Sequence, residues 1–142
     1  MKIVQHLMEA KGSEVWSVAP EDSVYEAIRL MAEKEIGALL VMDGDRLAGI
    51  LSERDYARSV ILKGRSSRET KVSEIMTREV VTGRLDHRIE VCLARMTERR
   101  IRHLPIVEDG QVKGMISMGD LVKAIIAEQQ ATIEQLEQYI TG

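Results

Sequence analysis

The chain has a single cysteine, Cys92, in 142 residues and so cannot form a disulfide within itself. It has no apolar run approaching the roughly 18 to 20 residues that a membrane-spanning helix needs, and Met1 to His6 do not begin a secretory signal. Positive charge is not in surplus either, because the formal net charge is −3, and this argues against a partner held through nucleic-acid phosphates. These absences predict a cytoplasmic protein that binds neither membrane nor nucleic acid.

The usual catalytic and metal-binding patterns are also missing. His6, His87 and His103 are not spaced with carboxylates as metal ligands, and there is no Gly-x-Ser-x-Gly, Gly-x-Gly-x-x-Gly or Walker loop. Cys92 falls on an apolar helical face and is expected to be a small buried side chain without thiol activation. The sequence therefore predicts no catalytic residue, no metal and no catalytic cofactor.

What the sequence does contain is an internal repeat. Gly49 to Asp55, GILSERD, returns as Gly114 to Asp120, GMISMGD, at a constant offset (114 − 49 = 65). The offset holds without a gap over 15–58 and 80–123. Self-similarity at a fixed period indicates a duplicated structural unit. A unit of about 60 residues buries too little of its surface to be comfortably stable alone, so we expect the two copies to share a core.

Each copy shows the apolar spacing of a β-α-β-β-α unit. In the first copy the pattern predicts a strand at 15–18, a helix from about 24, a hairpin of strands at 38–42 and 47–51, and a helix after Ser52. In the second copy it predicts a strand at 80–82, a helix from about 89, strands at 104–107 and 112–117, and a helix from about 119. The predicted fold class is therefore α/β (α+β).

The same repeat sets the predicted domain boundaries. The first repeat with its lead-in and connector takes residues 1–70, the second takes 71–127, and 128–142 form a C-terminal amphipathic helix. Short runs at 4–8 and 72–76 resemble each other and predict a helical turn before each copy. The basic stretch at 65–71 is interpreted as a solvated connector.

The motif Gly-φ-φ-Ser-x-x-Asp at the end of a duplicated β-α-β-β-α unit, together with RHLPIV at 102–107, resembles the cystathionine-β-synthase (CBS) domain pair. The resemblance runs from Val4 to Ile126 and is to a stand-alone pair. It implies tandem repeats packed with pseudo-two-fold symmetry around strand-lined clefts. It also implies a regulatory sensor for signal transduction, which binds an adenine nucleotide such as AMP, ADP, ATP, NAD or S-adenosylmethionine between the repeats and does not catalyse.

Ser52 with Asp55, and Ser117 with Asp120, are the central candidate residues. A serine three positions before an acidic residue is close to a helix capping box, which alone would stabilise a helix start. The box prefers the longer Glu or Gln, whereas the shorter Asp can accept hydrogen bonds from a ribose diol while the Ser faces phosphate at the positive helix end. In the family the Asp does hold ribose, and the two roles are compatible.

Basic side chains distinguish the two copies. Arg102 and His103 precede the second strand of copy two, where the family often uses basic residues on phosphates, whereas copy one has Gly37 and Ala38. Arg54 is the expected substitute in copy one, with an exposed helix-end charge as the alternative. The two sites are therefore predicted to be unequal, with occupancy in steps.

Ser17 and Thr82 lie at matching ends of the first strands, near where the family's backbone meets adenine, and the alternative is that both are solvated strand residues. The complete predicted set is Ser17, Gly37, Ala38, Ser52, Arg54, Asp55, Thr82, Arg102, His103, Ser117, Gly119 and Asp120.

Two other classes of function stay open at this point. One is a ligand-free scaffold whose tail helix docks a partner, and the other is a nucleotide-processing enzyme with Asp55 or Asp120 as its base. We also expect a homodimer, two pairs forming a flat disk, because the apolar residues Ile133, Leu136 and Ile140 of the tail need covering. The alternative is that the tail folds back onto its own chain. The effector protein that such a module would regulate is unknown.

Overall fold

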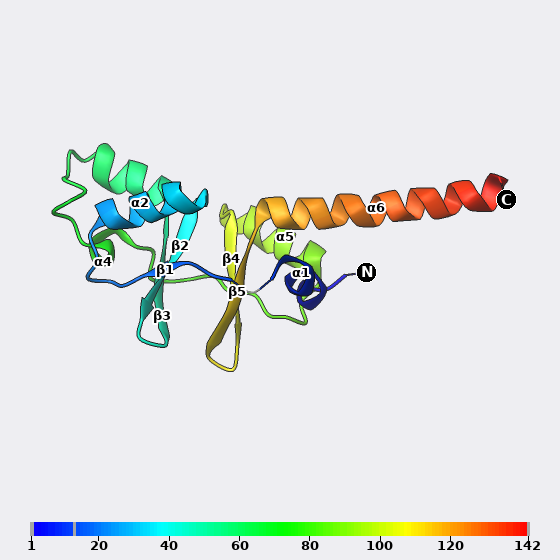
Figure 1. Cartoon of the computed structure of the whole chain (residues 1–142), viewed down its shortest axis with the longest axis horizontal. Coiled ribbons are helices and arrows are strands. Elements are labelled where there is room, and N and C mark those ends of the chain that lie inside the picture. Colours follow the sequence, from blue (N-terminus) through cyan, green and yellow to red (C-terminus); the bar gives the residue numbers. More distant parts are fainter. Residues whose placement is uncertain (1, 13, 142) are drawn as a thin grey trace. The chain divides into compact units, whose positions relative to one another are not determined.

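The computed structural model describes residues 2–12 and 14–141 (Figure 1). The residues outside this description are Met1, Ser13 and Gly142. Met1 is the predicted start of the first repeat, and Gly142 is the predicted end of the C-terminal helix. The chain divides into two compact units. Unit 1 contains the described residues of Met1–Ser13, Thr82–Val107 and Gly114–Gly142, and unit 2 contains Glu14–Val81 and Glu108–Lys113. The fold is mixed α/β, as the sequence predicts.

Unit 2 is built on a three-stranded sheet in the order β1-β2-β3. β1 (Ser17–Val18) runs parallel to β2 (Ala38–Asp43), which pairs antiparallel with β3 (Arg46–Ser52). The helices are α2 (Val24–Lys34), α3 (Glu53–Tyr56), its π-helical continuation η1 (Ala57–Ile61) and α4 (Val72–Ile75). The buried core joins Leu39, Val41 and Leu51 of the sheet to Val24, Ala27 and Met31 of α2. This is the predicted β-α-β-β-α order.

Helix α2 begins and ends where its local chemistry requires. The hydroxyl oxygen of Ser23 accepts a hydrogen bond from the Glu26 N–H at 3.1 Å, which satisfies one of the unpaired donors of the first turn. At the other end Glu35 adopts a left-handed conformation, with φ of 55°, and its N–H reaches back to the Met31 carbonyl. Arg100, which the 65-residue offset matches to Glu35, ends its own helix in the same way, with φ of 58°. The repeat therefore extends to the helix ends.

The basic connector between the repeats is mostly exposed, as predicted, and is also held by specific contacts. Arg65 pairs with Glu74 at 2.6 Å, and the guanidinium of Arg68 lies 3.8 Å from the centre of the Tyr25 ring. Thr70 is buried and its hydroxyl donates to the Ser66 carbonyl at 2.6 Å. The connector is tied to unit 2 because its cations find partners there, although their residues stay exposed.

Unit 1 contains α1 (Val4–Lys11), α5 (Ile89–Arg99), the hairpin strands β4 (His103–Glu108) and β5 (Gln111–Ser117), and α6 (Met118–Thr141). The tip of the hairpin is assigned to unit 2. The helix predicted from 119 and the predicted tail form one continuous helix, and Figure 1 shows α5 beside its first half. No helix within residues 2–12 and 14–141 combines the length and the apolar character that a membrane crossing requires.

The second repeat departs from the prediction at its first strand. The expected strand at 80–82 is reduced to an isolated parallel bridge between Gly83 and Ile106, the counterpart of Val18 and Val41 in β1 and β2. In the first repeat the Leu40 N–H donates to the Trp16 carbonyl at 3.3 Å. The matching residue is Pro105, which has no N–H to donate, so the ladder loses this bond.

Candidate functional site

Ser52 and Asp55 form a reciprocal cap at the start of α3. The Ser52 N–H donates to Asp55 Oδ2 at 2.9 Å, and the Asp55 N–H donates to Ser52 Oγ at 3.2 Å. The Ser52 hydroxyl also lies 3.1 Å from Asp55 Oδ2. The shorter aspartate thus closes a capping box, although such a box prefers the longer Glu or Gln. Ser52 has the extended backbone of an N-cap residue, with φ of −116° and ψ of 163°.

Ser117 and Asp120 form the same cap at the start of α6. The Ser117 N–H donates to Asp120 Oδ2 at 2.8 Å, and the Asp120 N–H donates to Ser117 Oγ at 3.1 Å. The first N–H of the helix, that of Met118, donates to the Arg102 carbonyl at 2.8 Å. The cap and the predicted phosphate-binding arginine are therefore neighbours within unit 1.

The equivalent backbone contact exists in unit 2, where the Glu53 N–H donates to the Gly37 carbonyl at 3.1 Å. Ala38 pairs with Ser52 across β2 and β3 and is completely buried. Ser17, exposed, pairs with Leu40 in the same sheet. The structure thus brings together Gly37, Ala38, Ser52 and Asp55 in unit 2. We call this group the Asp55 corner, and the matching group around Ser117 and Asp120 in unit 1 the Asp120 corner.

Both aspartates keep one carboxylate oxygen outside the cap. Every hydrogen bond that Asp55 and Asp120 accept within the described part of the chain goes to Oδ2. Oδ1 is the oxygen that stays open for an external donor. Arg102 is exposed, and its guanidinium has no partner among residues 2–12 and 14–141. The Asp120 corner therefore offers a carboxylate acceptor, from Asp120, and a cation, from Arg102, beside the N-terminus of α6.

The two corners differ most in a lysine that the sequence reasoning missed. Lys11, the last residue of α1, places its Nζ 2.5 Å from Asp120 Oδ2 and 2.8 Å from the Met115 carbonyl. Burial of Asp120 would raise the pKa of its carboxyl group, but the hydrogen bonds from Lys11 and Ser117 and the Lys11 charge outweigh burial and lower that pKa. At neutral pH Lys11 and Asp120 therefore form an ion pair within unit 1.

The lowered pKa gives the ion pair a pH dependence. Its stabilisation is fully present above the ordinary aspartate pKa of about 3.9 and is lost as the pH falls through the lower folded-state value. We expect Lys11→Met to reduce the free energy of unfolding at pH 7 by roughly 0.2 to 1 kcal/mol, the range for a partly exposed pair. Urea denaturation at pH 7 and at pH 3 measures this, and a difference that stays constant between them would contradict the assignment.

The remaining predicted residues lie as follows. Thr82 is half-buried, and its carbonyl accepts a hydrogen bond from Arg95 at 2.9 Å. His103 begins β4 and is half-buried, and Arg54 and Gly119 are exposed in the first turns of α3 and α6. Arg95 was not predicted, although the 65-residue offset matches it to Leu30 and so marks it as a difference between the copies.

The structure also describes the possible metal ligands and the cysteine. Among residues 2–12 and 14–141, no three His, Cys, Asp or Glu side chains are grouped as metal ligands. Cys92 is buried, as predicted, and burial raises the pKa of its thiol against a smaller opposing effect of Arg95. The thiol is therefore protonated at neutral pH and is a packing residue.

Comparisons with known proteins agree with this architecture. The family model described as "CBS domain" matches twice, at residues 6–61 and 72–127. The chain is 40% identical over 138 residues to the mitochondrial CBS domain-containing protein CBSX3 of Arabidopsis thaliana, covering 94% of this chain and 66% of that protein, so it spans just under two thirds of that relative.

Solved structures show the same similarity. A putative signal-transduction protein with CBS domains from Burkholderia ambifaria MC40-6 is 50% identical, with a TM-score of 0.87 over 90% of this chain and 96% of that one. The CBS domain pair of protein MJ0100, solved with 5′-methylthioadenosine and S-adenosyl-L-methionine, shares the fold at 23% identity, with a TM-score of 0.76 over 90% of this chain and 98% of that one. The chain, with its two matched repeats and duplicated Ser-x-x-Asp caps, belongs to the CBS domain family.

Proposed function

We propose that this protein is a regulatory module that binds an adenine nucleotide at each of its two Ser-x-x-Asp corners. One observation carries the proposal. In both Asp55 and Asp120, Oδ2 closes the helix cap, whereas Oδ1 accepts no hydrogen bond from the described residues. A fixed carboxylate with an open oxygen is a suitable acceptor for the hydroxyl groups of a ribose. The cap holds the carboxylate in place before the ligand arrives.

The Asp120 corner also suits a phosphate. It lies at the N-terminus of α6, a helix of 24 residues, where the helix dipole favours an anion. The backbone carbonyl of Arg102 accepts a hydrogen bond from the first turn of that helix. The exposed guanidinium of the same residue supplies planar N–H donors. These groups bind ribose and phosphate, which all nucleotides share. They therefore favour a nucleotide but do not distinguish AMP, ADP, ATP and NAD.

The family supports a regulatory role. CBS domain proteins are regulatory modules, one solved relative is described as a putative signal-transduction protein, and the MJ0100 pair carries two adenosine compounds on the same fold. We propose that this chain likewise senses a nucleotide and transmits its presence to an effector protein. No catalytic role is assigned to either aspartate.

Arg102→Ala tests the phosphate assignment. We expect AMP binding at the Asp120 corner to weaken about tenfold, as for loss of one charge-assisted hydrogen bond, while adenosine binding changes little because adenosine has no phosphate. Calorimetric titration with both ligands measures the two affinities. Equal losses for AMP and adenosine would show that Arg102 does not contact phosphate.

A thermal unfolding series with adenine nucleotides separates the three classes of function. A ligand that binds only the folded state raises the melting temperature with its concentration. Stabilisation by a nucleotide that is recovered unchanged supports the sensor, and turnover of that nucleotide supports the enzyme. No shift with AMP, ADP, ATP, NAD or S-adenosylmethionine at millimolar concentration favours the ligand-free scaffold.

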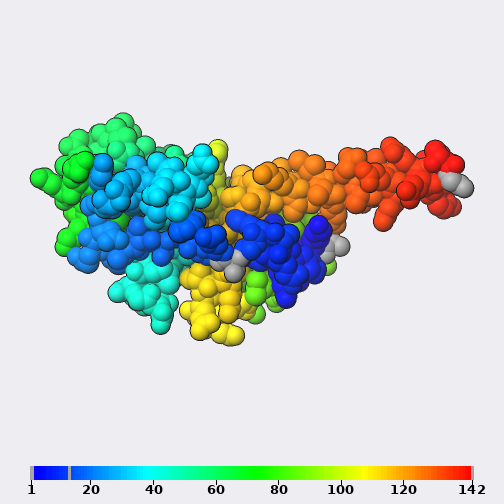
Figure 2. Space-filling view, in the orientation of Figure 1, coloured from blue at the N-terminus to red at the C-terminus, as the bar shows by residue number. Residues whose placement is uncertain are grey.

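We also propose that the protein is a homodimer assembled through α6. Leu136 is 57% exposed and Tyr139 is 88% exposed, and in Figure 2 the last part of α6 extends uncovered on the face shown. Ile126, Ile133 and Ile140 are seven residues apart, the spacing of a coiled-coil seam. A second copy can cover this stripe with its own, which is the self-complementary solution for a two-fold interface.

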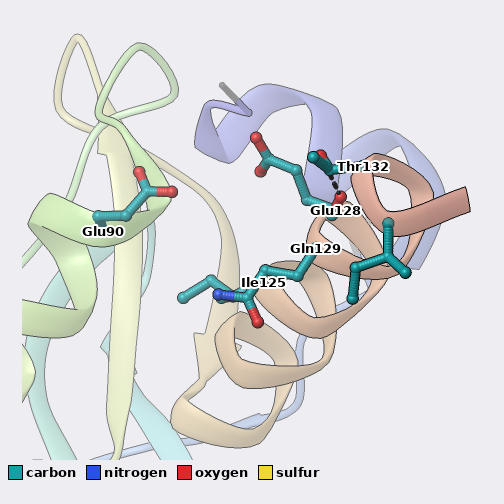
Figure 3. A pocket seen from close by; sticks show the side chains of 6 residues that line it. Glu90, Ile125, Glu128, Gln129 and Thr132 are labelled. Carbon is teal, nitrogen blue, oxygen red and sulfur yellow. Dashed lines mark hydrogen bonds between the residues drawn. The ribbon is translucent and has the colours of Figure 1, made fainter. Parts of the chain in front are cut away.

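The base of this stripe adjoins a shallow pocket between α5 and α6. It is lined by Glu90 of α5 and by Ile125, Glu128, Gln129, Thr132 and Ile133 of α6 (Figure 3). Thr132 donates to the Glu128 carbonyl at 3.1 Å, so its hydroxyl is used within the helix. Ile133 lines this pocket and also belongs to the stripe, so the two surfaces are continuous.

We propose the cytoplasm as the working compartment, because the single cysteine suits a reducing environment. A relative named as mitochondrial is 40% identical to this chain. Cell fractionation with an antibody against the chain decides between the two compartments.

A further inference from the structure

Lys11 gives Asp120 a paired cation, which Asp55 does not have within the described residues. Its ammonium bonds to both Asp120 Oδ2 and the Met115 carbonyl, and α1 is fixed behind it by Val4, Leu7 and Met8, all buried. The offset matches Met115 to Ile50, whose carbonyl is bonded instead by the Thr77 N–H at 2.9 Å. Among residues 2–12 and 14–141, no cation pairs with Asp55.

The backbone holds Lys11 at this place independently of the ion pair. The Val4 and Gln5 N–H groups donate to the His87 and Leu85 carbonyls, each at 2.9 Å, and these bonds fix the helix in unit 1. A lysine ammonium has three N–H donors, of which two are used by Asp120 and Met115. One donor is left beside the open oxygen of Asp120.

The charge matters because ribose and phosphate are joined in the ligand. Any nucleotide whose ribose reaches Asp120 brings its phosphate within several ångströms of that carboxylate, and two anions at such a distance repel each other. An ammonium already paired with the carboxylate cancels this repulsion. An uncharged nucleoside gains nothing comparable, because it carries no phosphate.

We propose that Lys11 is the residue that makes the Asp120 corner select an anionic nucleotide over the uncharged nucleoside. This inference rests on the proposed function of that corner. The Asp55 corner, whose aspartate has no paired cation in the described chain, discriminates less between AMP and adenosine. The lead-in helix α1 is thereby part of the ligand site of unit 1.

The test isolates the Asp120 corner in an Asp55→Ala background and compares AMP with adenosine by calorimetry at low and high salt. Lys11→Met is expected to weaken AMP about tenfold and adenosine less than about threefold, with the difference shrinking at high salt as screening increases. Lys11→Arg keeps the charge and is expected to restore most of the AMP affinity. Lys123→Met is the matched control, because Lys123 is exposed on α6 and has no partner within the described residues.

The outcomes separate this inference from the proposed function. If neither the parent protein nor Asp55→Ala binds AMP, the proposed function fails and this inference fails with it. If Asp55→Ala binds AMP and Lys11→Met binds it equally well, only the role of Lys11 is overturned. Tighter AMP binding by Lys11→Met would also overturn it, since the lysine would then compete with the ligand for Asp120.

Discussion

Replacing Asp55 or Asp120 with alanine is expected to weaken nucleotide binding at one corner by about ten- to a hundredfold and to leave the other corner almost unchanged. The loss corresponds to one hydrogen bond to a charged group, which is worth roughly 1.5 to 3 kcal/mol. The corners belong to different units, and each aspartate is capped by its own serine. Calorimetry with AMP therefore should report one weakened site in each single variant and two weakened sites in the double variant.

The aspartates also cap helices, so a loss of binding must be separated from a loss of structure. Losing a cap costs about 0.5 to 2 kcal/mol of stability. Asp55→Asn is the informative companion, because an amide oxygen can still accept the Ser52 N–H while its other group becomes a donor. Asp22→Ala is the matched control, since Asp22 accepts the Ala19 N–H at 2.8 Å outside either corner. Unchanged AMP affinity in both Asp55→Ala and Asp120→Ala would refute the ribose assignment.

Leu136→Glu is expected to turn the dimer into a monomer at micromolar concentration. Leu136 lies in the middle of the seam formed with Ile133 and Ile140, and a buried, unpaired carboxylate at that place costs several kcal/mol. Light scattering should report twice the 16.0 kDa chain mass for the parent protein and a single chain mass for the variant. Removal of residues 128–142 should have the same effect, because it removes the seam itself.

The control for this change is Gln138→Glu, which adds the same charge to the same turn of α6, two residues from Leu136 and off the seam. It should remain dimeric. A parent protein that is monomeric at micromolar concentration would contradict the homodimer and would leave the exposed tail to another partner. A parent dimer that survives both Leu136→Glu and the truncation would place the interface elsewhere on the chain.

The repeat made most of the fold predictable. A constant offset of 65 residues transfers each element of the first copy to the second, and it holds for structural details such as the left-handed helix ends at Glu35 and Arg100. It also locates the one clear failure. Pro105 matches Leu40, whose N–H donates a hydrogen bond to the first strand. The loss of that strand in the second copy could therefore have been predicted from the proline in the sequence.

The candidate site was only partly predictable. The two Ser-x-x-Asp caps follow from the motif because their partners are three residues apart. Lys11 does not follow from it, because its contact with Asp120 joins positions 109 residues apart through the placement of α1. That placement depends on backbone bonds to Leu85 and His87, for which the sequence carries no periodic signal. The asymmetry between the corners is therefore a tertiary property.

Calorimetric titration of the nucleotide-free parent protein with AMP tests the central claim most directly. Refolding from denaturant removes any nucleotide retained from the cell, and mass spectrometry of the released material identifies it. The account predicts saturable binding in two steps of unequal affinity, up to two equivalents per chain, with AMP recovered unchanged. No heat of binding with AMP, ADP, ATP, NAD or S-adenosylmethionine, and no retained nucleotide, would contradict it.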